Sequence, residues 1–372
     1  MLRSLETTPP PPARTTTDDI IGRARRARVW RGAAIGAGAA ACLAVAVAVS
    51  VPAVTGSGGG SGGVQPAGQP VPQASFSAPP AERTDPALPV DKIDFSSPLG
   101  QYRVGAFRIG PAVTVTGGYT ELPVYHDGTT LGGGSTEPLE VATIAVYGKG
   151  VYDTALFGGA GDATLVIGDQ YPVTVNGRGG LGRDWTYLSP TDAASKQVMA
   201  ALAWQYADDS WATLLPNYGG PDLSREQATA IAAGLSTSAR RDLKVPYRMT
   251  FVPEGWQAVA VRQPVPGGGS LSEVFLHAGP VADPVTRIDE VLPGHVKISV
   301  MKGLEPGKAD YTTDEGVHCV TGQGHCTIIK DDYRIDLDSY GAGLADTEVK
   351  RIAEGVQLRD PADPDTWVKV DF

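Results

Sequence analysis

The sequence is poor in the residues and motifs that most enzyme chemistry uses. Its 372 residues include 3 cysteines, 5 histidines and 4 methionines. No Gly-x-Ser-x-Gly, His-Glu-x-x-His or Cys-Gly-Ser-Cys motif occurs, so the common signatures of serine hydrolases, zinc proteases and cysteine proteases are missing. Ser299 and Lys302 form an isolated Ser-x-x-Lys inside an alternating strand pattern, without its usual partner motifs. These absences favour a non-enzymatic protein without a cofactor, although they leave the question of activity open.

Basic residues are scarce after the N-terminus. Seven of the 31 basic residues and three of the 41 acidic residues precede residue 32, which leaves 24 basic against 38 acidic residues, a net charge of −14. Nucleic-acid binding needs a basic surface that displaces counterions from phosphates. The main part of the chain lacks that surface, so we expect no nucleic-acid partner.

Long apolar runs are absent except for one, from Gly32 to Val54, which contains 23 residues and no charge. A helix of this length spans the hydrocarbon core of a bilayer. The arginine-rich residues 1–31 come directly before it, which predicts a cytoplasmic N-terminus and an exported main region. The length of both segments favours a retained signal anchor in the cell membrane. Cleavage of a signal peptide near Ala53 is the alternative.

Glycine, proline and serine dominate residues 55–92, which contain almost nothing that a core could bury. This composition predicts a disordered linker. From residue 93 onward, short β-branched and aromatic runs alternate with turn residues, as in antiparallel strands. Helical patterns occur at 223–236, where Ser224 and Gln227 fit a capping box, and at 344–357.

The two helical patterns belong to an internal repeat. Each follows a strand, an Asp-Asp turn and a second strand, with Asp208 and Asp209 in the first copy and Asp331 and Asp332 in the second. We therefore predict an α+β fold, mainly antiparallel β, in which two similar modules each end in a helix. The predicted order is a cytoplasmic tail at 1–31, a transmembrane helix at 32–54, the linker at 55–92, modules at 93–240 and 241–358, and a C-terminal tail at 359–372.

The segment "GVHCVTGQGHCTII", residues 316–329, contains two His-Cys pairs. A turn at Gly322 and Gln323 would place Cys319 opposite Cys326 in a hairpin, at a separation that suits a disulfide. Export to an oxidising compartment favours the same bond. The next turn, at residues 331–332, would pair Cys326 with Leu337, so the disulfide should face the apolar core. We predict a Cys319–Cys326 disulfide.

The histidines should point to the other face because side chains alternate along a strand. His318 would lie in a row with Asp336, and His325 in a row with Asp338. A Cys2His2 metal site would need all four side chains on one face, so we predict none. The polar face formed by His318, His325, Asp336 and Asp338 has two interpretations: a site for a polar ligand or a divalent ion, and a solvated sheet face.

Aromatic residues gather around the first copy's hairpin, including Trp204, Tyr206, Trp211 and Tyr218, and they suit either a β-rich core or a ligand groove. The arginine-rich "GRARRARVWRG", the Ala/Val segment and the linker together resemble uncharacterised single-pass membrane proteins of high-GC Gram-positive bacteria. That resemblance covers residues 18–90 and implies location rather than activity. We expect a membrane-tethered extracytoplasmic binding, sensory or envelope-interaction protein, with a cell-envelope protein or peptidoglycan as partner. The alternative is an extracytoplasmic hydrolase or metal-dependent enzyme that uses the His/Asp face.

Overall fold

The computed structural model describes residues 93–132, 134–157, 164–188, 196–264, 270–279, 294–303 and 314–372. By its internal contacts the chain divides after Gln73, and all of the described residues belong to the second unit, Ala74–Phe372. The predicted cytoplasmic tail, transmembrane helix and linker lie outside the described residues. Within the described part of the chain, no helix has the length and apolarity needed to cross a membrane.

The first half of the second unit contains twelve strands and one α-helix among its described residues. The elements are β1 (Ser96–Leu99), β2 (Tyr102–Val104), β3 (Phe107–Ile109), β4 (Thr114–Thr116), β5 (Tyr119–Thr130), β6 (Pro138–Tyr147), η1 (Thr154–Leu156), β7 (Leu165–Ile167), β8 (Tyr171–Val175), β9 (Arg178–Leu188), β10 (Lys196–Ala207), β11 (Ser210–Pro216), α2 (Arg225–Ala233) and β12 (Thr237–Asp242).

The second half repeats this mixture of many strands and one described α-helix. Its elements are β13 (Lys244–Val245), β14 (Tyr247–Met249), β15 (Trp256–Arg262), β16 (Ser270–Ala278), β17 (His295–Lys302), β18 (Gly316–Val320), β19 (His325–Lys330), β20 (Tyr333–Tyr340), α4 (Asp346–Glu354), β21 (Val356–Leu358), η2 (Pro364–Thr366) and β22 (Val368–Lys369). The expected α+β fold with mainly antiparallel strands is confirmed.

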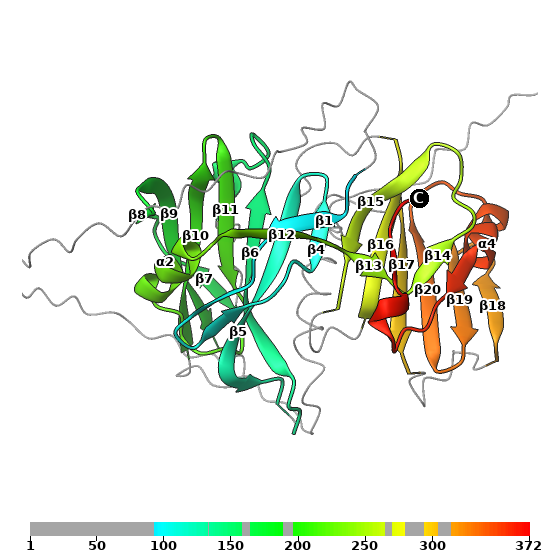
Figure 1. The fold of residues 1–372 in the computed structure, drawn as a ribbon, viewed down its shortest axis with the longest axis horizontal. Helices are drawn as coiled ribbons and strands as arrows, with labels where there is room; N and C mark the ends of the chain where they lie inside the picture. Colours follow the sequence, from blue (N-terminus) through cyan, green and yellow to red (C-terminus); the bar gives the residue numbers. More distant parts are fainter. Residues whose placement is uncertain are drawn as a thin grey trace, which may run out of the picture. The chain divides into compact units, whose positions relative to one another are not determined.

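One antiparallel sheet of 16 strands joins the two halves. Its main path runs β18-β19-β20-β17-β16-β15-β4-β5-β6-β11-β10-β9-β7, and the pairing of β15 with β4 connects the halves. The division into two separate modules therefore stays a prediction, because both halves contribute to one continuous sheet. Figure 1 shows this sheet with α2 against the strands of the first half and α4 against β19 and β20.

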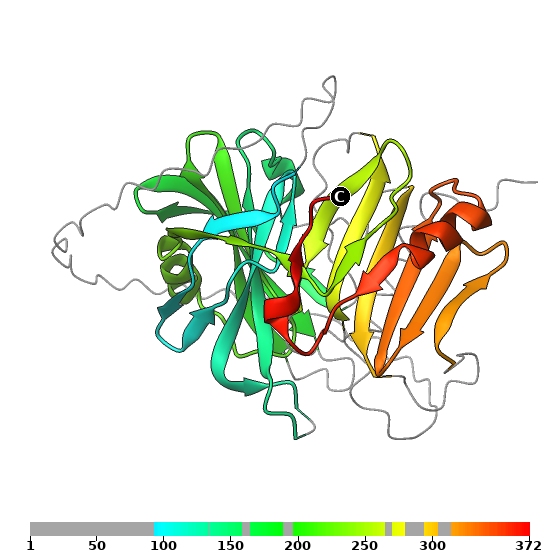
Figure 2. The same cartoon turned by 45° about the vertical axis from the view of Figure 1, so that its right-hand side comes forward.

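Each helix buries its apolar side on one face of the sheet and so forms a core. Ala228, Ile231 and Ala232 of α2 pack with strand residues such as Trp204, which is 1% exposed. In the second half, α4 packs with β14, β21 and the inward side chains of β15–β20. Figure 2 shows β14 and β21 on the same side of the sheet as α4. The opposite face of the second half is therefore free of the described helices.

The two helices end at glycines that are needed for close packing. Gly234 and Gly355 both have ordinary helical φ values, −79° and −78°. A Cβ on Gly234 would come within 2.6 Å of the Tyr102 ring, and one on Gly355 would come within 3.1 Å of Phe251. At each helix end, an aromatic residue thus occupies the space that a Cβ on the glycine would need. The predicted capping box of Ser224 and Gln227 is confirmed.

The β18–β20 meander has the predicted register. Cys319 pairs with Cys326, and Cys326 pairs with Leu337. The connection differs from the predicted two-residue turn, because a four-residue loop at 321–324 follows the Val320–His325 pair. Gly322 and Gly324 both adopt positive φ, 74° and 59°, which a two-residue turn with one leading glycine does not need.

The predicted disulfide between Cys319 and Cys326 is present. Its two ends have different surroundings, since Cys326 is fully buried in the core whereas Cys319 is exposed. The expectation that the disulfide faces the core therefore holds at Cys326 only. The reason is position: β19 lies inside the sheet, whereas β18 is its end strand.

Candidate functional site

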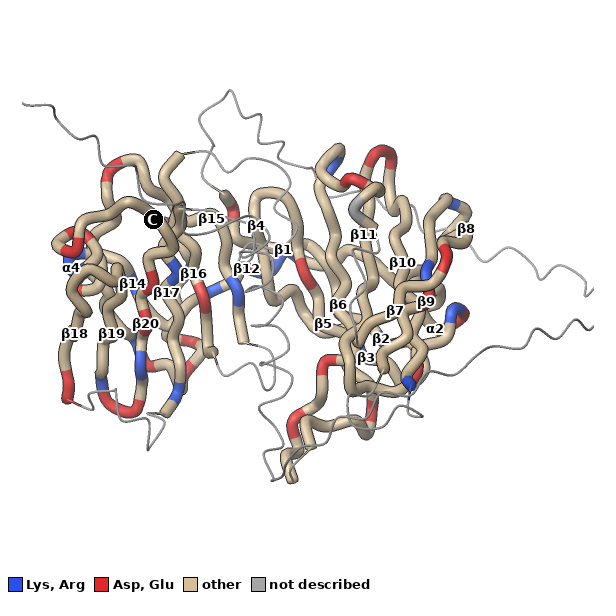
Figure 3. The backbone as a smooth tube through the Cα atoms, turned by 180° about the vertical axis from the view of Figure 1, so that it is seen from behind, with Lys and Arg blue, Asp and Glu red and all other residues tan. Residues whose placement is uncertain are grey.

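A row of polar side chains crosses eight neighbouring strands on the face opposite α4. Direct pairing places the members of the row side by side, and directly paired residues point to the same face of a sheet. We call this set the polar row; it consists of Glu121, Thr114, Arg262, Glu273, Ser299, Asp336, Thr327 and His318 on β5, β4, β15, β16, β17, β20, β19 and β18. Figure 3, seen from behind, shows basic and acidic positions on the neighbouring strands β16, β17 and β20.

The middle of the polar row is buried. Arg262 donates to the carboxylate of Glu273 at 3.0 Å and to the Thr114 hydroxyl at 3.4 Å. The side chains of Arg262 and Glu273 are 26% and 15% exposed. Ser299 is 5% exposed, and its Oγ has no hydrogen-bond partner among the described residues. A buried hydroxyl without a partner costs free energy unless a water molecule or a ligand bonds to it.

His325 links the polar row to the next row of the sheet. Its Nδ1 lies 2.7 Å from Asp338 Oδ1, and its Nε2 lies 3.1 Å from Thr327 Oγ1. Thr327 Oγ1 donates to Asp336 Oδ1 at 3.0 Å, and Arg334 Nε donates to the same oxygen at 2.7 Å. We call these five residues the His325 network; they are His325, Thr327, Arg334, Asp336 and Asp338.

The hydrogen-bond partners of His325 indicate a charged imidazole in this network. The single hydroxyl proton of Thr327 goes to Asp336, because a carboxylate only accepts. The Thr327 oxygen can therefore only accept from His325 Nε2, while Nδ1 donates to Asp338. Both bonds together require imidazolium. Accordingly, the hydrogen bond that His325 donates to Asp338 raises the pKa of His325 above its usual value, against the opposing effect of burial.

The structure brings together three of the four predicted site residues. His325, Asp336 and Asp338 belong to the His325 network. His318 sits at the end of the polar row, but its Nε2 lies 2.8 Å from the backbone oxygen of Asp314 and not against the network. Within the described ranges, no group of three or more His, Cys, Asp or Glu side chains has an arrangement that could hold a metal ion.

Sequence reasoning missed the basic members and the distant strands of this site. Arg334 could have been predicted from the sequence, because it alternates with Asp336 and Asp338 along β20. Arg262 and Glu273 could not have been predicted, since their proximity to Asp336 depends on the strand order β15-β16-β17-β20, in which β17 pairs with β20. No local pattern in the sequence encodes that order.

A second polar cluster lies near the first-half end of the row, around Glu140. Thr143 Oγ1 donates to Glu140 Oε1 at 2.6 Å, and Asn217 Nδ2 donates to the same oxygen at 3.3 Å. Burial raises the pKa of Glu140 to about 7, and the nearby charge of Glu121 acts in the same direction. Arg262 opposes this shift. The charges of Glu121 and Arg262, which come from the two halves of the polar row, therefore both affect the pKa of Glu140.

The aromatic residues divide between core and surface. Trp204 and Tyr206 are 1% and 7% exposed, as a core role predicts. Trp211 is only half-buried, and its ring lies 6.2 Å from that of Tyr152 on a separate small cluster. Tyr218 is 56% exposed. The hairpin aromatics thus do not line one groove.

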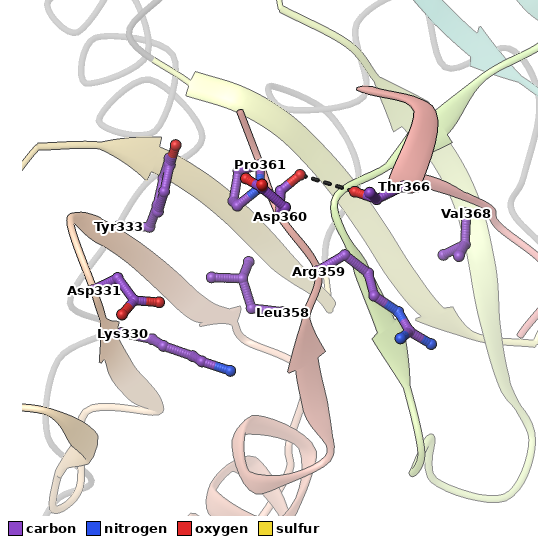
Figure 4. Close-up of a pocket in the computed structure, with 9 residues that line it drawn as sticks. All are labelled: Lys330, Asp331, Tyr333, Leu358, Arg359, Asp360, Pro361, Thr366 and Val368. Carbon is purple, nitrogen blue, oxygen red and sulfur yellow. Dashed lines mark hydrogen bonds between the residues drawn. The ribbon is translucent and has the colours of Figure 1, made fainter. Parts of the chain in front are cut away.

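An open groove of about 700 Å³ lies beside the β19–β20 turn. Figure 4 shows Lys330, Asp331 and Tyr333 on one side and the segment after β21 on the other, where Thr366 donates to the Asp360 backbone oxygen at 3.0 Å. Its charged side chains, Lys330, Asp331, Arg359 and Asp360, are all exposed. It lacks the buried polar groups of the polar row, which is therefore the stronger candidate site.

Comparison with known proteins adds little. No family model matches the chain, and no curated protein matches it significantly. The chain is similar to a solved structure of MucB in complex with MucA(peri), with 10% identity over 68% of this chain and 93% of that one and a TM-score of 0.19. It is also similar to a MucA/MucB complex structure from Pseudomonas aeruginosa, with 11% identity, the same coverages and a TM-score of 0.17. TM-scores this low do not establish a shared fold.

Proposed function

We propose that the chain is a non-enzymatic binding protein of the cell envelope, tethered to the membrane and folded outside the cytoplasm. The apolar run from Gly32 to Val54, its arginine-rich approach and the linker support the tether. The Cys319–Cys326 disulfide supports an oxidising compartment for the folded unit. Single-pass proteins of high-GC Gram-positive bacteria, which residues 18–90 resemble, have this layout.

The polar row is the proposed ligand site. The observation that carries this assignment is Ser299, whose buried hydroxyl finds no hydrogen-bond partner in the described part of the chain although Glu273 and Asp336 flank it in the row. The hydroxyl of Ser299 and the carboxylates of Glu273 and Asp336 beside it suit a ligand rich in amides and hydroxyls. A peptidoglycan fragment or a segment of an envelope protein has that chemistry.

The test is a titration of the full chain, in non-ionic detergent, with soluble peptidoglycan fragments and separately with purified envelope proteins. Ser299→Ala should weaken binding by about tenfold, or ~1.4 kcal/mol, while leaving thermal stability unchanged or higher, because it removes an unpaired buried hydroxyl. Ser272→Ala is the matched control. Ser272 Oγ is also buried without a partner, but Ser272 pairs with Val300 and points to the core face. Its removal should not change binding.

Two results would contradict the proposal. Equal binding by wild type and Ser299→Ala would remove the polar row as the site. A protein that binds none of these ligands but turns over a substrate would remove the non-enzymatic role.

A hydrolase is the second candidate, because one feature of the His325 network favours it. Thr327, His325 and Asp338 are linked in the order hydroxyl, imidazole and carboxylate, as in a nucleophile–base–acid triad. However, the Thr327 hydroxyl donates to Asp336 and not to His325, and it is 7% exposed. Turnover of a chromogenic ester that Thr327→Val abolishes would support this role. Loss of turnover on adding a chelator would support its metal-dependent form.

A further inference from the structure

The end strand β18 offers an unpaired edge. Among the described residues, β18 pairs with β19 and with no other strand. Its sequence, GVHCV, contains neither proline nor lysine, the residues that commonly protect an edge strand from further pairing. Val320 on this edge is 44% exposed.

The backbone groups that face this open edge can be identified. The Cα atoms of Cys319 and Cys326 are 4.0 Å apart, which is typical of a non-hydrogen-bonded pair. The Gly324 oxygen accepts from Ser339 N at 2.8 Å, so the even-numbered residues of β19 bond toward β20 and not toward β18. The N–H and C=O groups of Val317 and Cys319 therefore point away from β19, toward the open edge.

Acidic groups flank both ends of the edge. Asp314 and Glu315, both exposed, come directly before β18. At the other end, Asp346 at the start of α4 accepts from Gly322 N at 2.8 Å in the β18–β19 loop. Helix α4 packs over β18 and β19 on one face, so it forms one side of the space into which a further strand would fit.

We propose that the β18 edge binds an extended peptide segment with basic side chains, which adds to the sheet as a further strand beside α4. Main-chain hydrogen bonds to Val317 and Cys319 would hold the segment, and its basic side chains would meet the acidic ends of the edge. A second copy of the chain is the less favourable occupant. The net charge of −14 after residue 31 makes two copies repel each other.

This inference goes beyond the proposed function and does not depend on it. The polar row binds through side chains on one face, whereas the edge binds through backbone groups. Ser299→Ala tests the first and leaves the second intact, so the two can fail separately.

The experiment measures binding of the labelled peptide Ac-Arg-Val-Lys-Val-Arg-amide to the full chain in non-ionic detergent, by fluorescence anisotropy. Val317→Pro removes one outward N–H without breaking a bond to β19, and Val317→Ala is its matched control. The double variant Asp314→Lys, Glu315→Lys tests the charges. Asp360→Lys with Asp363→Lys, an equal change of charge in an exposed loop elsewhere, controls for net charge. Circular dichroism and thiol titration check that each variant folds with its disulfide.

We expect saturable binding that weakens at least tenfold in Val317→Pro and in the Asp314/Glu315 variant, with little change in both controls. A peptide of the same sequence with N-methylated backbone should not bind, because it cannot pair. Equal binding to Val317→Pro and wild type would overturn the proposal. The absence of saturable binding would also overturn it. If, in addition, sedimentation showed a concentration-dependent dimer that Val317→Pro dissociates, the edge would be assigned to a second copy.

Discussion

Replacing His325 with glutamine tests whether the His325 network carries a charged imidazole. The raised pKa of His325 means that the folded state holds this proton more tightly than the unfolded chain does. Its stabilisation is therefore fully present below the unfolded pKa of about 6.5 and is lost as pH rises through the folded pKa. His325→Gln should be most damaging in mild acid.

The magnitude follows from the bonds that would be lost. A hydrogen bond to a charged partner contributes about 1.5–3 kcal/mol when buried and less when solvent screens it. The side chains of His325 and Asp338 are 26% and 31% exposed, which places them between these limits. We expect His325→Gln to cost about 1–2 kcal/mol at pH 5.5 and clearly less at pH 8.5.

Thermal or urea unfolding of wild type and variant at both pH values measures this difference. Each kcal/mol corresponds to roughly 2–4 °C in the midpoint for a unit of this size. In an Asp338→Asn background, His325→Gln should lose most of its effect, because the two residues act as a pair. A cost that is equal at both pH values, or larger at pH 8.5, would refute the charged network.

Three further predictions concern stability. Glu140→Gln should raise stability at pH 8 by about 1 kcal/mol in urea unfolding, because a pKa raised to about 7 in the folded state means that stability is lost as pH rises from the unfolded value of 4.5 through about 7; no gain at pH 8 over pH 5 would contradict it. Reduction of the Cys319–Cys326 disulfide should lower stability by about 2 kcal/mol, as closure of a short loop predicts, and an unchanged melting temperature would show that the hairpin does not need it. Gly234→Ala should cost about 1–3 kcal/mol through its clash with the Tyr102 ring, whereas Gly179→Ala, whose Cβ meets nothing within 4 Å, should cost far less.

The β18–β20 meander shows how far sequence patterns reach. Alternation of apolar and polar residues, together with Asp turns, was enough to predict that Cys326 pairs with Leu337 and that His325 pairs with Asp338. Asp331 adopts positive φ in its turn, as a turn aspartate readily does. These relations are local, since the paired residues lie on consecutive strands that a short turn joins.

Relations between distant strands could not be predicted. Arg262 and Glu273 lie in one row with Asp336 only because β16 pairs with β17 and β17 pairs with β20. Ser299 meets Asp336 only because β17 joins β20 instead of β18. The exposure of Cys319 depends on the same fact, namely that β18 ends the sheet. Long-range strand order follows from how the whole sheet packs, which no short segment specifies.

Site-specific photocrosslinking in intact cells tests the proposed function most directly. A benzophenone side chain would replace His318, at the end of the polar row, and in a control variant it would replace Asp360, in the exposed groove wall. The proposal predicts a crosslink from position 318 to peptidoglycan or an envelope protein, weakened by Ser299→Ala and absent from position 360. Crosslinks to cytoplasmic proteins, or the same products from both positions, would contradict it.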